Sequence, residues 1–283
     1  MEDKLHKMKI MPGDNITKKA IEKYMQENKR LDLRGKFDHR DIEVKFNISK
    51  NAEGSVSVKI GKTEVVCGIK MGVGEPYPDH EKEGTMMTTL ELLPMSSLDY
   101  EYGPPRINAI ETARIIDRGI RESGFIDFEK LCIKEGEKVW TIFIDLASIN
   151  DDGNVLDAGA LAAILALKTA KMPVYDEETG MIKYGEFTEN SLPLTEDLPL
   201  TITFHKLGEN VFIDPTKEEE RASEGRLTIE MSQAKKDIMI NAMQKGEESS
   251  LDNETIDKML NEVEKIFKNL KNLVDAELKK AEK

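Results

Sequence analysis

The sequence of 283 residues predicts an α+β fold in which mixed or antiparallel sheets surround one apolar central helix. Three observations support this fold class. Apolar and polar residues alternate with period two over residues 41–92, as in half-buried strands. Helical periodicity takes over at residues 107–123 and again at 156–170, and strand patterns return at 199–246.

The N-terminal part predicts a short helix followed by a strand meander. Residues 14–28 form an amphipathic pattern whose apolar side consists of Ile21, Tyr24 and Met25. The alternating runs "RDIEVKFNIS", "GSVSVKI" and "TEVVCGIKMGV" follow, with Gly54 and Gly61 at the turns between them. These runs predict antiparallel strands, and "TMMTTLELLP" predicts another strand after a polar loop.

The middle of the chain predicts two helices separated by a buried strand. Residues 107–123 place Ile107, Ile110, Ile115 and Ile116 at helical spacing, and Gly124 provides a C-terminal stop. The run "KVWTIFIDLASI" reads as a buried strand, and the next helix, "LDAGALAAILALKTA", is apolar on nearly every side. The sheet resumes with "PLTITFHKLG", "NVFIDP", "RLTIEMSQ" and "DIMINAMQKG".

The C-terminal segment predicts a charged amphipathic helix. Its apolar positions are spaced three or four apart, at Ile256, Met259, Val263, Ile266, Leu270, Leu273 and Val274. Because this stripe lasts only about three heptads, a helix docked on its own domain is favoured over an intermolecular coiled coil. The expected organisation is an N-terminal helical extension at 1–28, a core at 29–246 and a C-terminal helix at 247–283.

Composition limits the partners and the cellular location. The formal net charge of −13 should repel nucleic acid, so any RNA contact requires a local basic patch. Cys67 and Cys132 have no second cysteine or histidine at ligand spacing, which suits a reduced, intracellular protein rather than a zinc site. No stretch has the length of a signal peptide or a membrane helix, so we expect a cytoplasmic protein with no membrane contact.

An acidic cluster offers the best candidate for a metal site. It contains Asp214, Glu218, Glu219, Glu220 and Glu224, and carboxylates of this kind can hold magnesium. A solvated loop is the favoured alternative. We therefore expect neither a metal nor a cofactor.

Three arginines form a stripe on the helix predicted at 107–123. Arg114, Arg118 and Arg121 stand at positions i, i+4 and i+7, which places them on one helix face. Two interpretations are about equally supported by the spacing alone. Local pairs with Glu111, Asp117 and Glu122 would neutralise the stripe, whereas unpaired arginines would contact phosphates.

Several ordered motifs resemble the RNase PH superfamily. They are the runs "LDLRGKFDHRDIEV", "KTEVVCGIKMGV", "NAIETARIIDRGIRES" and "IDLASINDDGNVLDAGALAAILAL". The resemblance covers roughly residues 21–246 and is greatest to the non-catalytic RNase PH-like subunit of the archaeal exosome. It implies a core with the βαβ architecture of ribosomal protein S5 domain 2. It also implies a hexameric ring in which active and inactive subunits alternate, with RNA-binding cap proteins and a channel for single-stranded RNA.

The residues that phosphorolysis needs in this family are replaced here. Active members carry a Gly-Ser-Arg or Gly-Thr-Arg triplet that binds phosphate, and the corresponding positions are Asn154, Val155 and Leu156. Active members also carry two aspartates six residues apart, and here Glu220 and Arg226 stand at those positions. An arginine cannot act as a general acid near neutral pH, so no catalytic residue is assigned.

The arginine stripe, by contrast, matches the family's pattern. Carried over residue by residue, the RNA-contacting positions fall on Arg114 and Arg118, while Arg121 has no match. The favoured hypothesis is a structural, RNA-positioning subunit that supports 3′ to 5′ RNA degradation by a catalytic RNase PH-like partner. The alternatives are a self-sufficient phosphorolytic exoribonuclease and a stand-alone RNA-binding module.

Overall fold

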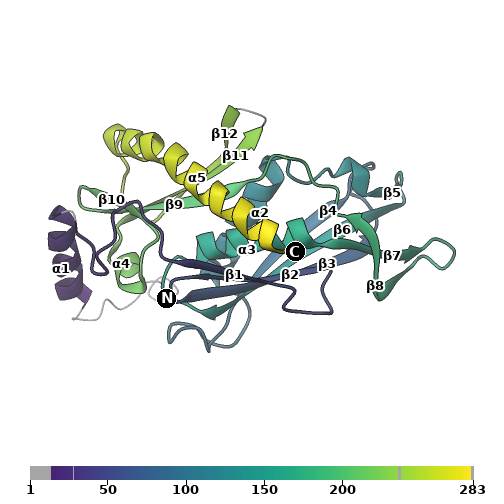
Figure 1. Cartoon of the computed structure of the whole chain (residues 1–283), viewed down its shortest axis with the longest axis horizontal. Helices are drawn as coiled ribbons and strands as arrows, with labels where there is room; N and C mark the ends of the chain where they lie inside the picture. The colour runs from purple at the N-terminus through teal and green to yellow at the C-terminus, as the bar shows by residue number, and fades with distance from the viewer. Residues whose placement is uncertain (1–13, 28, 235–236, 282–283) are drawn as a thin grey trace, which may run out of the picture.

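The computed structural model describes residues 14–27, 29–234 and 237–281 (Figure 1). Residues 1–13 and residue 28 of the predicted N-terminal extension lie outside the described residues. Helix α1 (Asp14–Gln26) buries Ile21 and Met25 against Leu207 and Phe212, whereas Tyr24 is 47% exposed. The apolar side of this helix is therefore narrower than the sequence pattern predicts.

The larger sheet has six strands and is mostly antiparallel. Its order is β1-β2-β3-β6-β4, with β5 paired to β6. The strands are β1 (Ile42–Phe46), β2 (Gly54–Ile60), β3 (Thr63–Gly74), β4 (Thr85–Leu92), β5 (Cys132–Lys134) and β6 (Lys138–Asn150). In β3 every second side chain is buried, as the period-two pattern predicts.

Among the described residues, the one parallel pairing in this sheet joins β4 to β6. Antiparallel strands can be joined by a tight turn, but a parallel pair needs a crossover. Helix α2 (Ile107–Glu122) lies in that crossover and packs on β4, and a short 3₁₀ helix (Glu129–Leu131) precedes β5. Ile115 and Ile116 of α2 are buried, but Ile107 and Ile110 are 57% and 44% exposed, so two of the four predicted apolar positions face outward.

The smaller sheet has four antiparallel strands in the order β10-β9-β11-β12. They are β9 (Leu200–Leu207), β10 (Asn210–Ile213), β11 (Gly225–Ala234) and β12 (Asp237–Gly246). Helix α3 (Val155–Thr169) contacts β2 and β3 of the larger sheet and β9 of the smaller one (Figure 1). All of its residues from Val155 to Leu167 are buried, which confirms the predicted central helix.

Helix α5 (Asn253–Ala281) packs along β9 and β10 (Figure 1). Its buried residues include Met259, Val263, Phe267 and Val274, which belong to the main hydrophobic core. The C-terminal helix is thus docked on its own domain, as expected. The succession of mixed sheets and helices confirms the predicted α+β fold.

Two segments of the chain differ from the prediction. Strands β7 (Lys171–Asp176) and β8 (Met181–Ser191) form a hairpin where no strand was expected. Helix α4 (Lys217–Ala222) replaces the predicted solvated loop, because a capping box joins Thr216 and Glu219. Among the described residues, no helix combines the length and the apolar character needed to cross a membrane.

Candidate functional site

The arginine stripe lies on the outer side of α2. Arg114 and Arg118 are exposed, and the opposite side of the helix packs Ala113, Ile116 and Ile120 into the core. Arg118 donates a hydrogen bond from Nη1 to Oε1 of Gln244 at 2.9 Å. Arg114 makes no hydrogen bond or ion pair with any residue that the structure describes. A guanidinium without a partner is available for a phosphate.

Arg121 is held differently from the other two arginines. Its Nε and Nη2 atoms donate to the carboxylate of Asp117, and Nη2 also donates to the carbonyl oxygen of Met86 at 3.1 Å. The guanidinium lies 5.7 Å from the ring centroid of Phe128. Arg121 is therefore tied to its own domain and not presented to a ligand.

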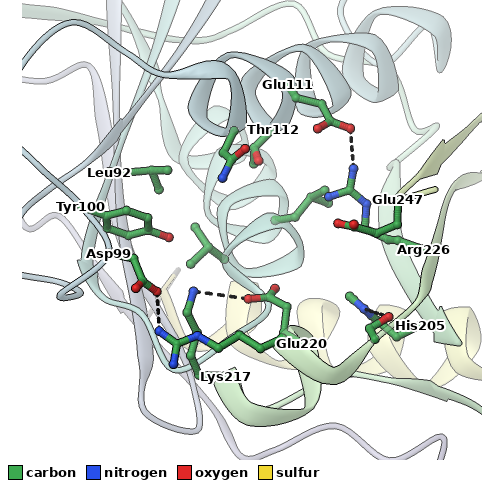
Figure 2. Close-up of a pocket in the computed structure, with 15 residues that line it drawn as sticks. Leu92, Asp99, Tyr100, Glu111, Thr112, His205, Lys217, Glu220, Arg226 and Glu247 are labelled. Atoms are coloured by element: carbon green, nitrogen blue, oxygen red, sulfur yellow. Dashed lines mark hydrogen bonds and ion pairs between the residues drawn. The ribbon is translucent and has the colours of Figure 1, made fainter. Parts of the chain in front are cut away.

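A cavity of about 260 Å³ lies beside α2 (Figure 2). Four of the positions that correspond to the active site of catalytic family members line this cavity. Val155 and Leu156 come from the start of α3, Glu220 from α4 and Arg226 from β11, and all four line the cavity. The side chains at the first two positions are apolar, so they provide no hydroxyl or cation for a phosphate.

Each arginine and lysine that lines this cavity is paired with a carboxylate (Figure 2). The pairs, by closest nitrogen–oxygen distance, are Lys217–Asp151 at 2.5 Å, Arg226–Glu111 at 2.5 Å and Arg221–Asp99 at 2.6 Å. Lys217 also lies 3.4 Å from Glu220. The three cations of the cavity are thus paired with carboxylates of the same chain.

Glu220 occupies the N-terminus of helix α3. Its Oε1 atom accepts a hydrogen bond from the backbone N–H of Asn154 at 3.1 Å. Backbone N–H groups at the start of a helix attract anions. Here one of these N–H groups already donates to a carboxylate of the same chain. Asn154 has a left-handed backbone, with φ of 63°, as the chain turns from β6 into α3.

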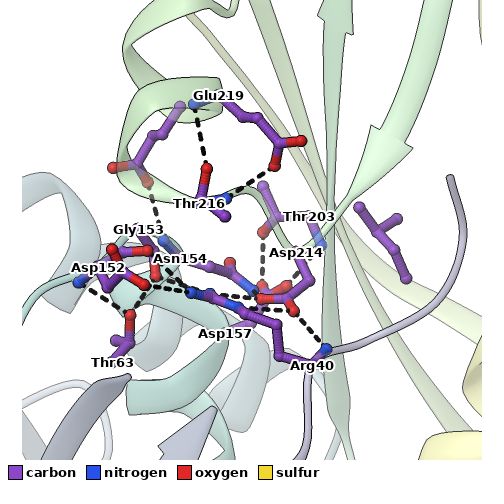
Figure 3. Close-up of polar contacts among 12 residues, drawn as sticks. Arg40, Thr63, Asp152, Gly153, Asn154, Asp157, Thr203, Asp214, Thr216 and Glu219 are labelled. Carbon is purple, nitrogen blue, oxygen red and sulfur yellow. Dashed lines mark hydrogen bonds and ion pairs between the residues drawn. The ribbon is translucent and has the colours of Figure 1, made fainter. Parts of the chain in front are cut away.

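Asp214 stabilises the turn between β6 and α3 through hydrogen bonds to Asn154 and Arg40 (Figure 3). The Asp214 carboxylate accepts hydrogen bonds from Arg34, from Arg40 and from Nδ2 of Asn154, at 2.7–3.0 Å. Burial raises the pKa of Asp214, but the hydrogen bonds and charge of Arg40 outweigh burial and lower the pKa to about 2. Arg40 also donates to the carbonyl oxygens of Asp152 and Gly153, at 2.8 and 3.0 Å.

Two residues of the acidic cluster predicted as a solvated loop belong instead to a buried ion network. Asp214 and Glu219 are fully buried, and Glu219 pairs with the equally buried Arg30. A buried carboxylate requires such partners, because an unpaired charge is costly to remove from water. No group of histidine, cysteine, aspartate or glutamate side chains within the described residues is arranged to hold a metal ion.

The sequence interpretation missed the arginines of this network. Arg34 and Arg40 lie in the first run that carries the resemblance and Arg30 directly precedes it, but their partners are about 180 residues away in the chain. No local spacing connects the two segments. The Thr216–Glu219 capping-box signature was the one signal that could have indicated an ordered α4.

Two further carboxyl groups are buried behind the arginine stripe. Asp157 accepts hydrogen bonds from the backbone N–H and the hydroxyl of Thr203, at 3.1 and 2.6 Å, and burial raises its pKa to about 7. Glu230 lies against Gly119, where a Cβ would come within 2.5 Å of the Glu230 Cδ atom. Its Oε1 atom is buried and has no hydrogen-bond partner in the described part of the chain.

The chain matches a known protein family and several relatives. Residues 38–173 match the first domain of the 3′ exoribonuclease family, RNase PH, and residues 197–262 match the second. The exosome complex component Rrp42 of Thermococcus onnurineus is 43% identical over 248 residues, which cover 87% of this chain and 89% of that protein.

Two solved structures have the same fold. One is an Archaeoglobus fulgidus exosome with RNA bound to the active site, with a TM-score of 0.79, 41% identity and coverage of 88% of this chain and 93% of that chain. The other is an archaeal exosome core, with a TM-score of 0.81, 38% identity and coverage of 94% and 100%. The resemblance and the fold predicted from the sequence are both confirmed, and the chain belongs to the RNase PH, or 3′ exoribonuclease, family.

Proposed function

We propose that this chain is a non-catalytic subunit of an archaeal-type exosome ring. In this role it supports 3′ to 5′ phosphorolysis of single-stranded RNA by a catalytic RNase PH-like partner, with which it alternates in a heterohexamer. We also propose that RNA-binding cap proteins are further partners of the ring and that the protein is cytoplasmic. Its basis is the membership in the RNase PH family and the identity to proteins named as exosome components.

One observation carries the non-catalytic part of the proposal. Phosphorolysis needs an inorganic phosphate held by N–H groups and cations, and a group that can protonate the leaving 3′ oxygen. Here Glu220 accepts the Asn154 N–H, and Val155 and Leu156 line the cavity where a phosphate would bind. Arg226 stands at the position of an acid and is itself paired with Glu111.

The RNA-positioning part of the proposal depends on the outer side of α2. Arg114 and Arg118 are exposed cations on a chain with a net charge of −13, and Arg114 has no partner among the described residues. Contacts with RNA phosphates would hold the scissile linkage in the partner's active site. Alignment of this kind can contribute several kcal/mol to catalysis.

The experiment compares RNA degradation in four samples that contain inorganic phosphate. The chain alone should not shorten a 5′-labelled RNA, whereas an equimolar mixture with its catalytic partner should be active. A mixture with the Arg114→Ala, Arg118→Ala double variant should assemble but degrade RNA more slowly, because surface arginines contribute little to folding. The slope of log affinity against log salt should also become flatter by about 1.4, at about 0.7 for each lost contact.

The fourth sample contains the Arg121→Ala variant, a matched control on the same helix. Since Arg121 is bound to Asp117 and Met86, its removal should change the salt slope less. Phosphate-dependent shortening by the chain alone would overturn the non-catalytic assignment. A double variant with the parental rate and salt slope would overturn the RNA contact.

A further inference from the structure

We propose that Arg226 is a positioning residue that holds Glu111 away from Arg114, so that Arg114 stays free to bind an RNA phosphate. The inference rests on the proposed function, because it assumes that Arg114 contacts RNA. The inference gives a role to Arg226, which lines a cavity to which the sequence assigns no catalytic residue. It also explains why the local neutralisation expected from the helix sequence does not occur.

Glu111 is the residue best placed to neutralise Arg114. The two side chains are three positions apart on α2, a spacing at which glutamate and arginine pair on a helix surface. In the structure Glu111 instead turns toward the smaller sheet, where its Oε1 atom lies 2.5 Å from Nη2 of Arg226 (Figure 2). The pair is partly shielded, with side chains 40% and 17% exposed.

Arg226 is held in place by its packing, so Glu111 is the side chain of the pair that can change partner. Its guanidinium lies against the backbone of Gly246 on β12, where a Cβ would come within 2.5 Å of Nη2. The Nε atom of Arg226 is buried and has no hydrogen-bond partner among the described residues. Glu111 on α2 is the more exposed partner, and its spacing to Arg114 is one at which the two side chains can pair.

The second local acid is also occupied. Asp117 lies three positions after Arg114, but its carboxylate accepts hydrogen bonds from Arg121 and from the hydroxyl of Thr88. Both acids that could pair with Arg114 at helical spacing are therefore bound elsewhere. This leaves Arg114 without a partner in the described part of the chain.

The test is a double-mutant cycle on Arg226 and Glu111 in the ring assembled with the catalytic partner. Arg226→Met frees Glu111 to pair with Arg114, which should weaken RNA affinity by a factor of about 1.5 to 2 and flatten the salt slope by up to about 0.7. Glu111→Gln alone should bind RNA at least as well as the parent. The double variant should return to parental affinity, because residue 111 no longer carries a charge that could pair with Arg114.

The rescue separates positioning from damage to the fold. If Arg226→Met merely disturbed the cavity, the double variant would bind as weakly as the single one, and that result would overturn the inference. Parental binding by Arg226→Met would overturn it as well. Arg221→Met is the matched control and should leave RNA affinity unchanged. Arg221 pairs with Asp99, which lines the cavity on the side away from Glu111 (Figure 2).

An Arg114→Ala variant distinguishes the two levels of the argument. Weaker RNA binding by Arg114→Ala with no effect of Arg226→Met would reject the positioning role alone. Unchanged binding by Arg114→Ala would reject the RNA contact itself, and the positioning role with it.

Discussion

Glu230 is a carboxyl group whose environment favours the protonated form. It is 2% exposed and lies behind α2. Burial raises its pKa to about 8, and the nearby charges of Asp157 and Glu122 add to the increase, while Arg118 opposes it. The folded protein therefore retains a proton near neutral pH that the unfolded chain, with the ordinary glutamate value of 4.5, releases.

The stability of the fold should consequently depend on pH through this residue. Because the folded-state pKa is raised, the stabilising contribution is complete below about pH 4.5 and is lost as the pH rises through about 8. Glu230→Gln keeps the shape of the protonated group and does not titrate. Relative to the parent, the variant should become more stable with rising pH, by at most about 1.4 kcal/mol per pH unit.

Urea unfolding of both proteins between about pH 5.5 and 8.5 measures this difference. Glu218→Gln, at an exposed position on α4, is the control and should follow the parent at every pH. Parallel stability curves for Glu230→Gln and the parent would show that Glu230 titrates as an ordinary glutamate.

At the level of elements, the sequence predicts best what is periodic and buried. The alternation in β3 and the all-apolar α3 are both realised, since burial selects the residue type at each position. The β7–β8 hairpin has mostly exposed side chains, so no burial pattern marks it. Helix α4 has only six residues, too few for a helical period to appear.

The candidate site was predictable only in part, for a similar reason. Arg114 and Arg118 follow a local spacing, and the structure leaves both exposed on one helix. The bond from Asn154 to Glu220 and the pair of Arg226 with Glu111 join residues 66 and 115 positions apart. Contacts over such separations are set by tertiary packing and leave no pattern in a single sequence.

Helix α4 is short enough that its cap should decide its stability. The Thr216 hydroxyl accepts from the backbone N–H of Glu219, and the Glu219 carboxylate accepts from the backbone N–H of Thr216. Thr216→Ala removes half of this capping box and should lower the free energy of unfolding by about 1 kcal/mol. Thr216→Ser retains the hydroxyl and should stay near the parent when both are unfolded in urea, whereas equal losses in the two variants would exclude the cap as the cause.

At the scale of the whole molecule, charge determines what the chain can do alone. A net charge of −13 repels RNA at long range, and the exposed pair Arg114 and Arg118 forms only a small local patch. The isolated chain should therefore bind single-stranded RNA much more weakly than the ring assembled with its partner. Fluorescence anisotropy at matched salt measures this ratio, and equal affinities would instead favour a stand-alone RNA-binding module.

The smaller sheet ends in an open edge. Strand β12 pairs with β11 on one side and with no other strand in the described part of the chain, and Met239, Ile240 and Met243 on it are 41–45% exposed. Unpaired backbone groups along a strand of ten residues are a template on which further strands can add. An isolated copy of this chain therefore presents an edge on which strands of other chains can add, so its aggregation should increase with protein concentration.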